Sequence, residues 1–139
     1  MIDFSELYRA LDETVSFFER EEEKVVAKTL KSRIVKRTIN GMDAHGAAFI
    51  PYVPRYKGYR QRHGLQVEHV DLYALSNPHL LESITQMDNH TLFFLPEFVE
   101  IARALQARRE FFTANEQDWN AVAEAVAVEY NYKHEYGTA

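Results

Sequence analysis

The chain has 139 residues and a net charge of −5, and its 46% hydrophobic and 27% charged residues lie near the averages for soluble globular proteins. This length suits one domain with one core, residues 1–139, and the composition argues against a disordered or fibrous protein. Because there is no cysteine, disulfides, thiolate zinc sites and cysteine nucleophiles are excluded.

The N-terminus MIDFSELYRALDE is acidic and amphipathic. A secretory signal would place basic residues before a continuous apolar run, so we expect no export signal. No run of about 18 apolar residues occurs, so we also expect no membrane span and a protein that is soluble when made.

A long first helix is predicted over residues 4–34. Asp3 and Glu6 have the spacing of a capping box, in which each side chain accepts a hydrogen bond from the first helical turn. Apolar residues then recur at three- and four-residue steps: Phe4, Leu7, Leu11, Val15, Phe18, Val26, Leu30 and Ile34. We expect packing of this stripe to supply most of the helix stability.

Residues 35–64 contain four of the five glycines and two of the four prolines. We interpret them as one long ordered loop, because an unstructured connection of this length is unusual inside a compact domain unless it has a function. Aromatic and basic side chains alternate through this loop, which suggests that it contacts another macromolecule.

The remaining elements predict a small sheet and a closing helix. Residues 65–73 have a strand pattern, and residues 81–87 with 91–95 flank a turn at 88–90, which predicts a β-hairpin. Residues 98–109 indicate a helix or an irregular connection. Thr113 and Glu116 predict a second capping box ahead of a helix over 114–130, followed by a flexible tail over 131–139. The resulting class is α+β: the long first helix and the closing helix pack on a small antiparallel sheet, and residues 65–130 contain that sheet and the closing helix.

We find no arrangement of residues typical of catalysis, cofactor binding or metal binding. The six histidines never form H-E-x-x-H, no serine stands in G-x-S-x-G, and the glycines form no phosphate-binding loop. His69 and Asp71 would share one face of the predicted strand and could ligate a metal, but a solvated sheet face is the simpler interpretation. We therefore predict a protein that is not an enzyme and has no catalytic residue, cofactor or metal.

The candidate functional residues are basic and aromatic and lie within the predicted loop: Tyr52, Arg55, Tyr56, Lys57, Tyr59, Arg60 and Arg62. Residues 20–62 have a net charge of +7, whereas residues 1–19 and 63–139 have net charges of −4 and −8. Tyrosine and arginine are favoured in protein interfaces, which is the interpretation we prefer. A nucleic-acid site and a plain solvated loop are the alternatives.

Several short motifs follow one another along residues 41–118. The sequence G-M-D-A-H-G-A-A-F-I-P-Y begins at Gly41 and is followed by Arg55-Tyr56 and a basic run to Gly64. Val70-Asp71-Leu72, the leucine-led stretch 80–84, Ala107-Arg108, Phe111-Phe112 and the acidic stretch 115–118 follow. Over residues 34–128 the chain resembles the virion-morphogenesis or tail-completion family of tailed phages. Residues 98–106 depart from it, because that family usually has a histidine and glycines there.

The resemblance implies a non-enzymatic α+β subunit of the virion neck or upper tail. Copies would join in a homo-oligomeric ring and contact other neck and tail proteins, such as an adaptor, stopper, tail terminator or tail tube. Heterologous contacts are required for a ring to close. We expect the candidate residues to provide the subunit interface, and a nucleic-acid-binding function remains the alternative.

Overall fold

The computed structural model describes residues 1–5, 20–88 and 91–136. Its elements are β1 (Ile2–Asp3), α2 (Arg20–Ile39), α3 (Pro54–Arg62), β2 (Ile84–Asp88), β3 (Thr91–Phe94), a short 3-10 helix η1 (Pro96–Phe98), α4 (Val99–Arg108) and α5 (Glu116–Tyr136). The predicted α+β class is therefore confirmed.

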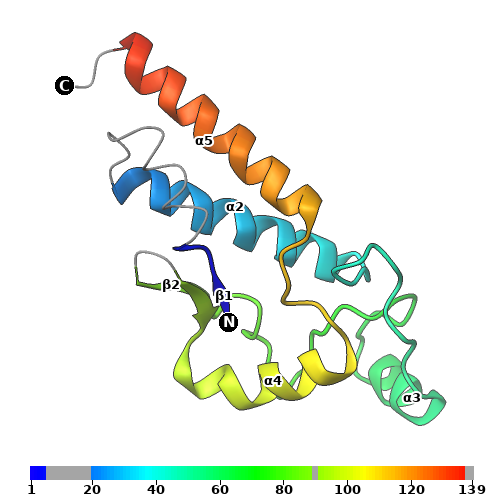
Figure 1. The fold of residues 1–139 in the computed structure, drawn as a ribbon. Helices are drawn as coiled ribbons and strands as arrows, with labels where there is room; N and C mark the ends of the chain where they lie inside the picture. The colour runs from blue at the N-terminus through cyan, green and yellow to red at the C-terminus, as the bar shows by residue number, and fades with distance from the viewer. Residues whose placement is uncertain (6–19, 89–90, 137–139) are drawn as a thin grey trace.

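The sheet has three antiparallel strands in the order β1-β3-β2. The predicted hairpin is confirmed: Ile84 pairs with Phe94, and the pairing has an irregularity between Gln86 and Asp88. Residues 89 and 90 of the predicted turn lie outside the described residues. Strand β1 was not predicted, because a two-residue strand has no detectable alternation. Figure 1 shows α2 and α5 side by side on one side of the sheet and α4 on the other.

The core lies where α2 meets the sheet and the segment before α5. Leu30 and Ile34 of α2 are fully buried, as are Ile84 and Leu92 of the hairpin. Phe94, Phe111 and Phe112 form an aromatic cluster, with the ring centroids of Phe94 and Phe112 4.7 Å apart. Burial of such side chains stabilises the fold by roughly 1.5–3 kcal/mol each relative to exposure.

Helix α2 confirms the predicted first helix from Arg20 onward but continues five residues past the predicted end. Residues 6–19, including Glu6 of the predicted capping box, lie outside the described residues. The helix ends where Gly41 adopts a φ of +81°. The Met42 N–H donates to the Arg37 carbonyl at 3.0 Å and the Gly41 N–H to the Thr38 carbonyl at 3.0 Å, which is a Schellman motif.

Gly41 and Gly46 both have a positive φ, and a comparison of the two provides a prediction on stability. A Cβ at Gly41 would lie 2.9 Å from the Cβ of His69, whereas a Cβ at Gly46, where φ is +80°, would meet nothing within 4 Å. We expect Gly46→Ala to lower the free energy of unfolding by about 1–2 kcal/mol through its backbone conformation. Gly41→Ala should cost roughly 1–3 kcal/mol more, because His69 must move. Urea denaturation of both variants measures the difference, and equal costs would show that the His69 contact is unimportant.

Helix α5 differs from its prediction at both ends. It starts at Glu116, because Asn115 and Asp118 form the capping box: Asn115 Oδ1 accepts from the Asp118 N–H at 2.8 Å, and Asp118 Oδ2 accepts from the Asn115 N–H at 2.9 Å. The predicted Thr113 and Glu116 box is therefore wrong. The helix also continues to Tyr136, six residues past its predicted end, so residues 131–136 of the predicted tail are helical. Residues 137–139 lie outside the described residues.

The strand predicted over residues 65–73 is also wrong, because this segment pairs with no other strand. Side-chain oxygens instead accept hydrogen bonds from its backbone N–H groups. Gln66 Oε1 accepts from the N–H groups of Glu68 and His69, and Asp71 Oδ1 accepts from the Tyr73 N–H at 3.0 Å. Leu72 adopts a φ of +59°, which no strand allows. Of the two alternatives for residues 98–109, the helix is the correct one.

Candidate functional site

Most of the candidate residues lie on a helix that was not predicted. Residues 54–62 form α3, so the prediction of one continuous loop over 35–64 is wrong at both ends. Pro54 stands at the start of the helix, where its missing N–H and its fixed φ are tolerated. The sequence PRYKGYRQR has little hydrophobic periodicity, and Gly58 lowers helix propensity, so local preference alone gives a weak signal.

Arg60 fixes α3 to the rest of the molecule. Its side chain is 0% exposed, and its guanidinium donates to the Gln66 carbonyl at 3.0 Å, the Tyr73 carbonyl at 2.6 Å and Asp71 Oδ1 at 3.2 Å. The guanidinium carbon lies 4.6 Å from the Tyr52 ring centroid. A buried arginine requires this complete set of partners, because an unpaired charge in the interior is costly.

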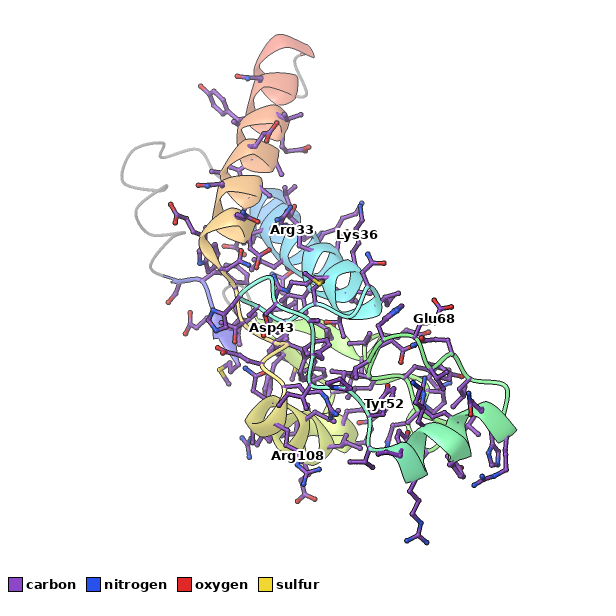
Figure 2. All side chains as sticks on the ribbon, turned by 90° about the vertical axis from the view of Figure 1, so that its right-hand side faces the viewer. Arg33, Lys36, Asp43, Tyr52, Glu68 and Arg108 are labelled. Carbon is purple, nitrogen blue, oxygen red and sulfur yellow. The ribbon has the colours of Figure 1, made fainter. Side chains whose placement is uncertain are left out.

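Tyrosines continue this cluster toward the surface. The rings of Tyr52 and Tyr56 meet edge to face at 5.1 Å, Tyr56 stacks with Tyr59 at 5.9 Å, and Tyr59 lies 4.1 Å from the His63 ring. Burial raises the pKa of the Tyr52 phenol, so the hydroxyl remains protonated and donates to Asp71 Oδ1 at 3.3 Å. Figure 2 shows Tyr52 where α3 meets the rest of the molecule.

The seven candidate residues therefore fall into three groups. Arg60 is wholly buried, so its assignment to a subunit interface is wrong. Tyr52 and Tyr56 are half-buried and support the helix. The other four are exposed, and together with the exposed His63 they form what we call the α3 face: Arg55, Lys57, Tyr59, Arg62 and His63.

Arg109 is a contributor that sequence reasoning missed. It donates from Nε and Nη2 to the Ile50 carbonyl at 3.2 and 3.1 Å, and its guanidinium carbon lies 5.7 Å from the Tyr52 ring centroid. With Tyr52, it borders a hollow of about 290 Å³ between α3 and α4. No sequence pattern links residues 52 and 109, so only the folded chain reveals this pairing.

The glycine-containing segment that carries much of the family resemblance is a compact turn. Asp43 Oδ1 accepts from the N–H groups of His45 and Ala47 at 2.8 and 2.9 Å. His45 Nε2 lies 2.7 Å from Glu110 Oε2, and hydrogen bonding to His45 lowers the pKa of that carboxyl. Asn115 Nδ2 donates to the Ala44 carbonyl at 2.7 Å. The turn is thus tied to the segment ahead of α5, and Asp43 has a structural role.

A second charged cluster joins α2 to α5. Asp118 accepts from Arg33 Nε and from Arg37 Nη1, each at 2.8 Å, and its side chain is 1% exposed. Burial alone would raise the pKa of Asp118, but hydrogen bonds from the Asn115 N–H and both arginines outweigh it and lower the pKa. Both arginines border a hollow of about 660 Å³ and share Asp118, which offsets one of their two positive charges. We interpret this cluster as structural.

The two residues considered as metal ligands have other partners. His69 Nε2 lies 2.7 Å from the Ile39 carbonyl, and Asp71 bonds to Arg60 and Tyr52. Within residues 1–5, 20–88 and 91–136, no group of three histidine or acidic residues could hold a metal ion. No helix in this part of the chain is long and apolar enough to cross a membrane.

The chain was also compared with known proteins. No protein-family model, curated protein or solved structure matches it.

Proposed function

We propose that this protein is a non-enzymatic structural subunit of the neck or upper tail of a tailed bacteriophage, where copies join in a ring through the α3 face. The resemblance over residues 34–128 supports the location in the virion. An adaptor, stopper, tail terminator or tail-tube protein would then lie next to the ring. The α+β architecture is the one that this resemblance leads us to expect.

The main support for the proposal is that Arg60 attaches α3 to the segment of residues 66–73 by hydrogen bonds. Buried Arg60 uses its guanidinium to hold one side of the helix, which leaves the α3 face directed to solvent. A surface that is rigid before binding loses less conformational entropy on association than a mobile loop does. Figure 1 shows α3 at the periphery of the molecule, away from the α2 and α5 pair, where a neighbouring protein can reach it.

The chemistry of this surface suits a protein partner. Arg55, Lys57 and Arg62 would guide encounter and set register with an acidic surface. Val53 and Tyr59 are 65% and 38% exposed, and their burial would supply affinity. Arginine and tyrosine are also enriched among the residues that dominate binding energy in interfaces.

Charge reversal on α3 tests the proposal. We expect Arg55→Glu, Lys57→Glu and Arg62→Glu together to abolish self-association, because they oppose an acidic partner surface with like charge. The monomer should stay folded, since exposed substitutions usually change stability by less than about 0.5 kcal/mol each. Sedimentation velocity at low salt measures association, and circular dichroism confirms folding.

The matched control reverses three other exposed cations, by Lys28→Glu, Lys36→Glu and Arg103→Glu. This variant has the same net charge but an intact α3 face, so it should assemble as the wild type does. Equal loss of assembly in both variants would indicate a net-charge effect and contradict a specific role for α3.

Nucleic-acid binding is the second candidate function, favoured by the exposed cations beside Tyr59. The ring contacts of Tyr52, Tyr56 and Tyr59 with one another leave less aromatic surface for bases. Binding to short single-stranded DNA that weakens steeply with salt would support this function over the first.

A further inference from the structure

Helix α5 has an exposed face that is chemically opposite to the α3 face. Val122 and Val126 point inward and are buried, as is Asp118 at the α2 contact. The other side of the helix is exposed, and we call it the α5 face: Glu116, Gln117, Asn120, Glu124, Ala127 and Val128. At 100° per residue these positions share one side of the helix.

The two faces also show complete segregation of charge in the sequence. No aspartate or glutamate occurs between Asp43 and Glu68, a stretch that contains all of α3. No lysine, arginine or histidine occurs between Arg109 and Lys133, which covers most of α5. Neither face therefore has, within its own segment, a charge of the opposite sign that would repel the other face.

Position excludes a contact between the two faces within one molecule. Figure 1 shows α3 at one end of the molecule and the outer side of α5 toward the other, and Figure 2 gives the same separation from a second direction. A contact between two complementary faces on different parts of the surface would be heterologous. It closes into a ring when the rotation between copies allows it, and otherwise continues as a filament.

Apolar groups accompany the charges on both faces. Val128 is 63% exposed on α5, and Val53 is 65% exposed at the start of α3. The hollow of about 290 Å³ beside α3 is lined mostly by apolar and aromatic side chains, Val53 and Tyr56 among them. Apolar anchors surrounded by complementary charge are typical of stable interfaces.

We infer that the α3 face of one copy binds the α5 face of a second copy, head to tail. This inference rests on the proposed function and names the partner of the α3 face as this same chain. Arg55 and Arg62, which lie on the same side of α3, would pair with Glu116 and Glu124 of the next copy, and Val128 would be the apolar anchor.

A charge exchange tests the inference. The first variant reverses α3 by Arg55→Glu, Lys57→Glu and Arg62→Glu, and the second reverses α5 by Glu116→Lys and Glu124→Lys. Each variant alone opposes like charges at every contact and should sediment as a 16.2 kDa monomer. In an equal mixture, the reversed α3 face of the first variant meets the reversed α5 face of the second, and the original α3 face of the second meets the original α5 face of the first. Both contacts join opposite charges, so assembly should return. One chain that carries both sets of changes should also assemble.

The outcomes separate this inference from the function on which it rests. If α3 reversal abolishes assembly but neither the mixture nor the doubly reversed chain restores it, the α5 face is the wrong partner and the proposed function stands. If the α3-reversed chain assembles like the wild type, both are overturned. Thermal unfolding of every variant, monitored by circular dichroism, confirms that only folded proteins are compared.

Discussion

Arg60→Met is expected to lower the free energy of unfolding by about 3–5 kcal/mol, the range for loss of one partner from a buried charged pair. The methionine would occupy similar space but leave the carbonyls of Gln66 and Tyr73 without their donor. Asp71 would lose its charged partner as well. Because Arg60 also contacts Tyr52, the whole support of α3 should loosen.

Urea denaturation with Arg62→Met as the matched control measures this effect. Arg62 lies on the same helix but is exposed, so its replacement should change stability by less than about 0.5 kcal/mol. Arg60→Lys should fall between the two, because an ammonium retains the charge but lacks the planar fork of donors. Equal stabilities for the Arg60→Met and Arg62→Met variants would show that the buried guanidinium does not hold α3 in place.

Asp118→Asn is the second change with a large expected effect, a loss of about 3 kcal/mol or more at neutral pH. The amide cannot accept from Arg33, Arg37 and the Asn115 N–H together, and its NH₂ group faces a guanidinium. The contact between α2 and α5 should weaken, and so should the first turn of α5. Glu124→Gln, an exposed change on the same helix, is the control and should be nearly neutral.

The effect of Asp118 should depend on pH in one direction. Its pKa in the folded protein is lower than the ordinary value of 3.8, so the unfolded chain takes up the proton first as the pH falls. The stabilisation is complete well above pH 3.8 and is lost as the pH falls from there through the folded-state pKa. The wild type and the Asp118→Asn variant should therefore approach each other in stability toward pH 2. A stability gap that stays constant over this range would contradict the assigned pairing.

The features that could be predicted from sequence are those with local patterns. Leu30 and Ile34 belong to an apolar stripe with helical spacing, and the hairpin has two strand-forming runs around a turn. The class of the fold follows from such signals. The exact ends of the helices are harder to predict from sequence. At the start of α5, two pairs have capping-box spacing, Asn115 with Asp118 and Thr113 with Glu116. The contacts of Arg33 and Arg37 with Asp118 favour the first pair, and these contacts exist only in the folded chain.

The site was predicted only in part for a related reason. The composition of residues 52–62 indicates a binding surface, but it does not distinguish Arg60 from Arg62, one fully buried and the other exposed. That difference depends on Asp71 and the Tyr73 carbonyl, which belong to a segment whose alternation resembles a strand. When side chains satisfy a backbone, as Gln66 does here, pattern reasoning predicts a strand that does not form.

Self-association through α3 is the claim on which the functional account depends. Light scattering of the wild-type chain over a concentration series, at low and at high salt, tests it most directly. We predict a mass that rises above 16.2 kDa with concentration at low salt, falls as salt screens the charged faces, and stays at 16.2 kDa in the α3-reversed variant. A wild-type chain that remains at 16.2 kDa at every concentration would contradict the account.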